Sequence, residues 1–254
     1  MDPMARIVES VLKESTAGGR ITEYFRESGR WEGPMRRGFD ALRGSLNVRD
    51  RQALGEASGP VRRLNWVYRT RLPVARVRSI AEAVLDEIDK QGWSFAGPPA
   101  LFGCSQQEEG VLAEFVPRAM DAVAQAGVPG RPYSFVTKLL HFRCPDSFPI
   151  CDSQAATSIQ MWSYAAFEAE GEQRDRFEWG ALANTSGGGY KGVLEFYRRF
   201  WDAASESQRS RLAERAREME GIIHGRVTTL DLVDKLLWSA TGDPLRLGLR
   251  VVAM

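Results

Sequence analysis

The sequence contains few of the residues on which disulfide, metal and membrane proteins depend. It has two histidines and three cysteines in 254 residues. Cys104, Cys144 and Cys151 are odd in number and lack the spacing of a disulfide framework, which predicts reduced thiols. No run of about 18 uncharged apolar residues is present, and the first residues lack the apolar core of a signal peptide. We therefore expect a soluble, cytoplasmic protein without a membrane-spanning segment.

One close group of potential metal ligands does occur. His141, Cys144 and Cys151 lie within eleven residues of one another, but their spacing matches no familiar zinc signature. We therefore predict neither a metal site nor a cofactor.

Lysine is scarce, and the positive charge is unevenly distributed. Only five of the 34 basic residues are lysines. Residues 1–78 hold sixteen Lys and Arg against nine Asp and Glu, a net charge of +7 that leaves −6 for the remainder. The densest part surrounds Trp66 and Tyr68 and contains Arg62, Arg63, Arg69, Arg71, Arg76 and Arg78. Such a segment suits a phosphate backbone, and we expect its first four arginines to bind DNA. A solvated helix face is the alternative.

Helical periodicity dominates the chain, and no convincing strand pattern is longer than about five residues. We therefore predict an all-α fold made of a single helical unit, with two interlocked lobes as the alternative. Residues 1–95 form its basic N-terminal part, and residues 96–254 carry the segment described next. The expected helices are 3–15, 20–28, 33–43, 48–57, 74–91, 107–126, 132–143, 152–168, 190–203, 206–220 and 228–240.

The chemistry is concentrated in one segment around a lysine and an aspartate. Lys138 lies on an apolar predicted helix, in Phe135-Val-Thr-Lys-Leu-Leu-His, and Asp152 opens the next helix, in Phe148-Pro-Ile-Cys-Asp-Ser. Removal of a lysine from water disfavours its ammonium form and makes a neutral amine available for attack. A carboxylate beside it stabilises a developing cation. This combination is typical of amine-nucleophile chemistry at the C1′ carbon of a sugar.

Residues 127–160 resemble the catalytic segment of 8-oxoguanine DNA glycosylase-like proteins in the helix-hairpin-helix glycosylase superfamily. In that superfamily a lysine is the Schiff-base nucleophile, and an aspartate after a proline-containing turn is its partner. The resemblance assigns these roles to Lys138 and Asp152. Gly127-Val-Pro-Gly130 replaces the usual Gly-x-Gly hairpin, so divergent members are the better comparison. The resemblance implies a helix-hairpin-helix-like fold without a cofactor.

Each of these residues also has a purely structural interpretation. Lys138 could lie on the surface of an amphipathic helix, and Asp152 could simply cap a helix N-terminus. Thr137 and His141 are candidates for tuning the lysine, with a core role as the alternative for the histidine. Aromatic residues after the motif could stack an extruded base or belong to the core, and they are Trp162, Phe167, Trp179, Tyr190, Phe196, Tyr197 and Trp201.

The sequence therefore predicts a monomeric DNA glycosylase that acts on double-stranded DNA. Such an enzyme flips a damaged or modified base, hydrolyses the N-glycosidic bond, and gains an AP lyase activity if the lysine forms an imine. The substrate is an 8-oxoguanine-like base in DNA repair or a hypermodified base of phage DNA in phage defence. The alternative from another class is a non-catalytic helical DNA-binding protein. A helical interaction module unrelated to DNA is a third reading.

Overall fold

The computed structural model describes residues 3–16, 20–41, 59–68, 72–93, 97–128, 132–152, 155–156, 158–159, 162 and 188–239. Every regular element within these ranges is an α-helix, which confirms the all-α prediction. The helices are α1 (Pro3–Thr16), α2 (Arg20–Ala41), α4 (Pro60–Val67), α5 (Val74–Lys90), α7 (Gln106–Gln125), α8 (Tyr133–Arg143), α11 (Gly188–Ala203), α12 (Glu206–Ile223) and α13 (Thr229–Ser239).

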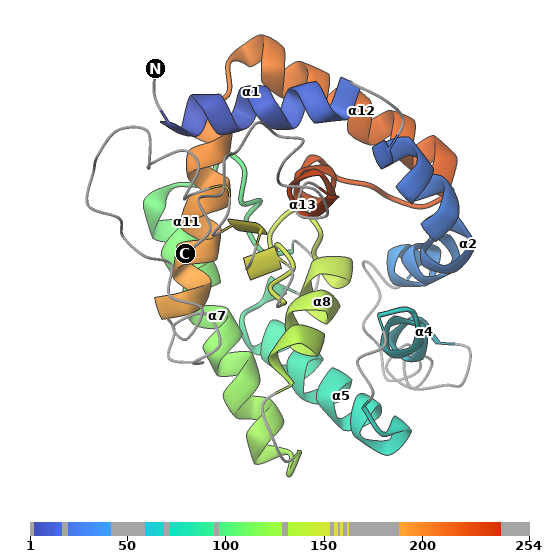
Figure 1. The fold of residues 1–254 in the computed structure, drawn as a ribbon. Coiled ribbons are helices and arrows are strands. Elements are labelled where there is room, and N and C mark those ends of the chain that lie inside the picture. Colours follow the sequence, from blue (N-terminus) through green and yellow to red (C-terminus); the bar gives the residue numbers. More distant parts are fainter. Residues whose placement is uncertain are drawn as a thin grey trace, which may run out of the picture.

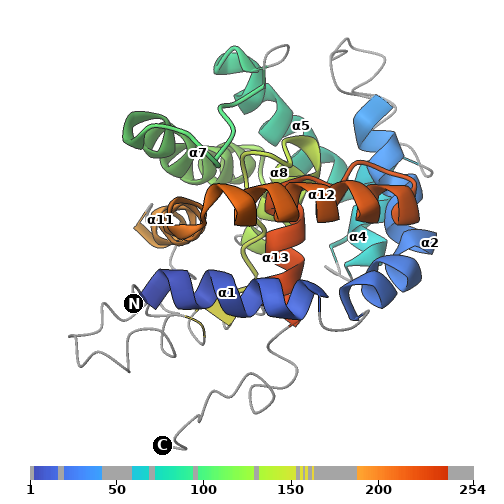
Figure 2. The same ribbon diagram turned by 90° about the horizontal axis from the view of Figure 1, so that it is seen from above.

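Two of these helices, α8 and α13, lie at the centre with the others arranged around them (Figures 1 and 2). Residues 135–143 of α8 and 230–237 of α13 are all buried. Helix α8 packs against α2, α4, α5 and α7, and α13 packs against α1, α2 and α12. A helix enclosed in this way exposes no face to water. Charged residues on α8 and α13 must therefore find partners inside the protein.

Seven of the predicted helices agree with the structure to within three residues at either end. Their predicted ranges are 3–15, 74–91, 107–126, 132–143, 190–203, 206–220 and 228–240. Two N-caps explain the sharp boundaries of α7 and α12, because Ser105 and Ser205 each form a capping box with the residue three positions later. The predicted helix 48–57 lies outside the described residues.

The predicted break between helices 20–28 and 33–43 is wrong, because α2 runs without interruption from Arg20 to Ala41. Gly33 and Pro34 lie inside this continuous helix. A Cβ atom on Gly33 would lie 2.3 Å from the carbonyl oxygen of Ile223, so glycine permits α12 to end directly against α2. Packing against α12 and α4 outweighs the backbone hydrogen bond that Pro34 removes.

Helix α4 was not predicted, because its residues belong to the basic segment around Trp66. Pro60 occupies its first turn, where a missing N–H has no cost, and Gly59 precedes it in an extended conformation. Within the predicted helix 152–168, the described residues at 155–156, 158–159 and 162 are all helical.

Candidate active site

Lys138 is buried rather than exposed. Only 4% of the residue is accessible to solvent, since α8 is surrounded on all sides. The alternative of a surface lysine on an amphipathic helix is therefore wrong. A buried ammonium needs acceptors, and the structure supplies them nearby.

The side chain of Lys138 reaches two oxygen atoms. Its Nζ donates to Asp152 Oδ2 at 2.7 Å and to Ser134 Oγ at 2.7 Å. Ser134 lies one helical turn before Lys138 on α8, whereas Asp152 follows fourteen residues later. The sequence prediction that brought Lys138 and Asp152 together thus agrees with the geometry. Ser134 was missed, although its i−4 spacing places it on the same helix face.

Asp152 is both the partner of Lys138 and the cap of the following helical turn. Its Oδ1 accepts from the Ala155 N–H at 2.9 Å, while its carbonyl accepts from the Ala156 N–H at 3.0 Å. Burial alone would raise the pKa of this carboxyl, but the Lys138 ammonium and the Ala155 N–H outweigh it and lower the pKa below its ordinary value. The Asp152 side chain keeps 19% of its surface exposed, so the ionised oxygen of the pair lies nearest to solvent.

Thr137 holds the segment before Asp152 in place. Its hydroxyl donates to the carbonyl of Cys151 at 3.0 Å, and the same oxygen accepts from the Cys151 N–H at 3.3 Å. These two bonds clamp the backbone beside Asp152 to α8. Thr137 therefore positions the carboxylate without contacting Lys138 Nζ through either bond.

His141 occupies the core. It is fully buried, its Nδ1 lies 2.8 Å from the Phe148 carbonyl oxygen, and its Nε2 lies 3.0 Å from Asp231 Oδ1. Each ring nitrogen thus has an oxygen atom within hydrogen-bonding distance. Of the two roles considered for this histidine, the structure favours the core role, since both nitrogens face partners other than Lys138.

His141 leads into a buried polar network between α2, α8 and α13 that the sequence did not reveal. Arg36 donates to both oxygens of Asp231, at 2.5 and 3.2 Å, and to Glu32 Oε2 at 2.8 Å. Tyr24 and Tyr68 both donate to Glu32 Oε1, at 2.9 and 2.8 Å. Burial raises the pKa of Glu32 and of Asp231, but the combined effect of Arg36 and Lys235, with His141 also acting on Asp231, outweighs it and lowers both pKa values.

Tyr68 connects this network to the candidate site. Lys138 Nζ lies 5.4 Å from the centre of its ring, and Lys235 Nζ lies 5.7 Å from the same centre. Both ammonium groups therefore interact with one π system. Lys235 is 5% exposed, and its Nζ lies 3.5 Å from Asp234 Oδ2. The Tyr197 hydroxyl of α11 donates to the other oxygen, Asp234 Oδ1, at 2.7 Å. The candidate site thus contains a second buried lysine.

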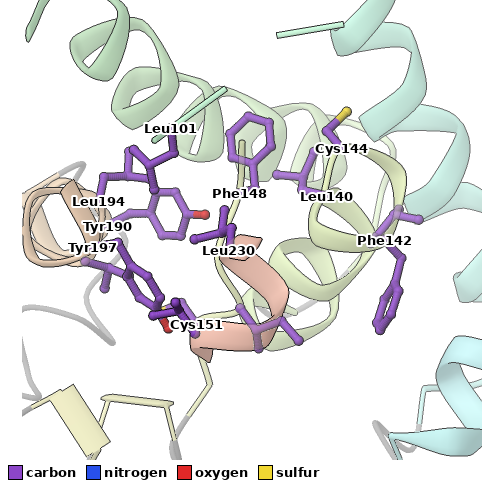
Figure 3. Close-up of a cluster of buried hydrophobic side chains, with 14 of the residues drawn as sticks. Leu101, Leu140, Phe142, Cys144, Phe148, Cys151, Tyr190, Leu194, Tyr197 and Leu230 are labelled. Atoms are coloured by element: carbon purple, nitrogen blue, oxygen red, sulfur yellow. The ribbon is translucent and has the colours of Figure 1, made fainter. Parts of the chain in front are cut away.

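Most of the aromatic residues after the motif belong to the core. Trp162, Tyr190, Phe196 and Tyr197 are 3% exposed or less. Figure 3 shows Tyr190 and Tyr197 pointing from α11 toward Phe148 and Cys151, and the Tyr190 hydroxyl donates to the Pro149 carbonyl at 2.9 Å. Tyr190 and Tyr197 therefore pack against the residues that directly precede Asp152. Trp201 is partly buried and stacks on Phe102, while Phe167 and Trp179 lie outside the described residues.

The predicted DNA-binding arginines are described only in part. Arg63 is exposed and Arg62 is partly exposed on α4, whereas Arg69 and Arg71 lie outside the described ranges. Arg78 pairs with Glu82 one turn later on α5, at 2.7 Å. That pair is typical of a solvated helix face, which favours the alternative interpretation for this end of the segment.

Metal ligands are not gathered in the part of the chain that the structure describes. No group of three or more His, Cys, Asp and Glu side chains there is arranged to hold an ion. None of the helices among the described residues combines the length and apolar character needed to span a bilayer. Cys104, Cys144 and Cys151 are all described, and none is joined in a disulfide.

Comparison of the chain with protein-family models, with curated proteins and with solved structures gave no match.

Proposed function

We propose that this protein is a helix-hairpin-helix-like DNA glycosylase in which Lys138 is the nucleophile and Asp152 its electrostatic partner. The observation that carries the proposal is the 2.7 Å contact between Lys138 Nζ and Asp152 Oδ2. The amine belongs to a buried helix, and the carboxylate caps the start of the next one with part of its surface exposed.

The arrangement fits displacement of a base at C1′. Lys138 Nζ gives up a proton, which passes to the departing base, and the lone pair freed in this way forms a bond to C1′ while the electron pair of the N-glycosidic bond leaves with that base. Opening of the sugar ring then converts the adduct into an imine, which is the route to AP lyase activity. Because the pKa of Asp152 is lowered, its carboxylate stays ionised. It is therefore suited to stabilising the positive charge that develops at C1′.

Double-stranded DNA is the proposed partner. The net charge of +7 on residues 1–78 and the exposure of Arg63 support a phosphate-binding surface on the N-terminal part. We propose that Arg62 and Arg63, with Arg69 and Arg71, contact the backbone. A monomeric, cytoplasmic enzyme stays a prediction.

The proposed substrate is an oxidised purine, 8-oxoguanine above all, by the resemblance of residues 127–160. The second candidate is a hypermodified base of phage DNA, whose excision would leave abasic sites that block replication. The two differ in the free base that appears. A repair enzyme releases 8-oxoguanine from a defined duplex, whereas a defence enzyme ignores that duplex and acts only on the modified genome.

The test is mass spectrometry of bases released from a panel of defined duplexes and modified phage DNAs. The wild-type protein should release one base and leave abasic sites, and the Lys138→Gln variant should not. Retention of DNA without release of any base from the whole panel would contradict the proposal and favour the non-catalytic DNA-binding protein.

A further inference from the structure

Two tryptophans lie side by side on the surface of α2 and α4. Trp31 is 51% exposed and Trp66 is 63% exposed, and their ring centres are 5.0 Å apart in an edge-to-face arrangement. Tryptophan is highly buried on average, so a neighbouring pair that is half open to water is unusual. Exposed apolar surface of this kind marks an interaction site.

The surroundings of the pair are basic. Arg62 and Arg63 precede Trp66 by one helical turn and therefore share its side of α4. The exposed Arg30 adjoins Trp31 on α2, and Glu27, one turn before Trp31, is the exposed acidic neighbour. Aromatic faces within a positively charged surface are the combination with which proteins hold unpaired nucleotides.

The pair also belongs to the same packed unit as the candidate site. Helices α2 and α4 are in contact, as both views of the fold show (Figures 1 and 2). Trp31 directly precedes Glu32, and Tyr68, two residues after Trp66, donates to Glu32 at 2.8 Å. Tyr68 in turn lies over Lys138 Nζ. The tryptophan pair therefore lies on helices that pack against α8, the helix of the candidate lysine, and Tyr68 connects the two.

We propose that Trp31 and Trp66 form a stacking surface for an unpaired DNA base. This inference rests on the proposed glycosylase function, in which extrusion of one base leaves the base opposite it unpaired. An indole can stack on a base only when a face of that base is uncovered, which a paired duplex interior does not offer. Arg62 and Arg63 would bind phosphates of the same strand, independently of sequence.

The experiment compares a fully paired duplex with the same duplex carrying one unpaired base, by fluorescence anisotropy of labelled DNA. The wild-type protein should prefer the second duplex. The Trp31→Ala/Trp66→Ala variant should bind the duplex with the unpaired base about tenfold more weakly, because each stacked base contributes on the order of a tenfold gain in affinity or more. Its affinity for the fully paired duplex should stay nearly constant.

Three matched variants separate stacking from other effects. Trp31→Phe/Trp66→Phe keeps aromatic faces and should keep most of the preference. Val111→Ala, at an exposed apolar residue on α7, should change nothing. Arg62→Gln/Arg63→Gln should weaken binding to both duplexes by the same factor and reduce the salt dependence of binding.

An unchanged preference in the double alanine variant, with circular dichroism showing that it is folded, overturns the inference. So does a wild-type protein that self-associates through the pair, seen as a smaller sedimentation coefficient after the alanine substitutions. Base release distinguishes the two proposals. If the protein releases a base but its preference for the unpaired base does not depend on the tryptophans, the glycosylase proposal stands and the stacking surface is wrong. If the preference depends on the tryptophans but no base is released, the stacking surface stands and the glycosylase proposal is wrong.

Discussion

The two buried lysines, Lys138 and Lys235, have similar immediate contacts and different surroundings. They are 4% and 5% exposed, they lie at 5.4 and 5.7 Å from the centre of the Tyr68 ring, and each has an aspartate partner. The partners differ. Asp152 keeps 19% of its side chain exposed, whereas Asp234 keeps 4%.

The enclosed lysine belongs to the scaffold. Burial lowers the pKa of Lys235. Tyr24 and the carboxylates of Asp234, Glu32 and Asp231 together raise it by more than burial lowers it, so the pKa lies well above its ordinary value. A group held so firmly in its ammonium form is a poor nucleophile. Lys138 has one carboxylate partner in the described contacts of its Nζ, and that partner faces solvent. The two lysines are therefore buried to a similar degree and differ in the solvent exposure of their aspartate partners, and the proposed role of Lys138 depends on that difference.

The largest expected effect is on stability, and it should separate the two lysines. Lys235→Met leaves Asp234 without its buried cation partner, which should cost about 3–5 kcal/mol of the free energy of unfolding. Lys138→Met should cost clearly less, because Asp152 stays partly solvated and bonded to the Ala155 N–H. Urea unfolding followed by circular dichroism measures both. Equal losses would remove the distinction between the two sites.

Asp152→Asn should have the next largest effect, on activity. The amide retains a capping oxygen but loses the charge, so the fold and DNA binding should persist while the rate of base release falls on the order of a hundredfold. Single-turnover release of the base at saturating protein measures this rate. A variant with near-normal turnover would reduce Asp152 to a helix cap.

Acid should act mainly on the enclosed network. Glu32 and Asp231 have pKa values below their ordinary ones, so the stability they provide is present above about pH 4 and is lost as the pH falls through their folded pKa values. Asp234 acts in the opposite direction, because burial raises its pKa. Unfolding free energies between pH 7 and pH 3 should therefore decrease. The decrease should be shallower in Asp231→Asn than in the wild type, and identical slopes would show that this carboxyl does not contribute.

Thr137→Val should have the smallest effect of the series. The substitution keeps the shape of the side chain but removes both bonds to the Cys151 backbone, at a cost of about 1–2 kcal/mol. Base release should slow severalfold because Asp152 is held less firmly. Thr137→Ser restores the hydroxyl and should restore the rate. Failure of this rescue would mean that the hydroxyl does not position the carboxylate.

Local signals in the sequence were sufficient for part of the site. The apolar run around Lys138 predicts a buried helix, and the residues before Asp152 predict a new helix start, so both side chains and the cap could be anticipated. Ser134 could have been added from its i−4 spacing. In each case the relevant partners lie within about one helix of one another.

Most of the network around Arg36 could not be predicted, because its members outside α2 are far away in the chain, whereas Glu32 lies four residues before Arg36 on α2. Arg36 binds Asp231, which lies 195 residues later, and Tyr68 reaches Glu32 across 36 residues. A local hint in α13 is its group of three charged residues, Asp231, Asp234 and Lys235, in a helix whose other residues are mostly apolar. Charges in an enclosed helix require buried partners, but nothing in the sequence identifies them. The predicted break in α2 was wrong for a similar reason, because Gly33 packs against the backbone of Ile223 on α12, which is far away in the sequence.

The central claim, that Lys138 and not Lys235 is the nucleophile, is tested most directly by borohydride trapping on substrate DNA followed by mass spectrometry of the adduct peptide. The account predicts a covalent adduct on Lys138 in the wild type, none in Lys138→Gln, and an adduct in the folded fraction of Lys235→Gln. Equal trapping by Lys138→Gln, or an adduct mapped to Lys235, would contradict it.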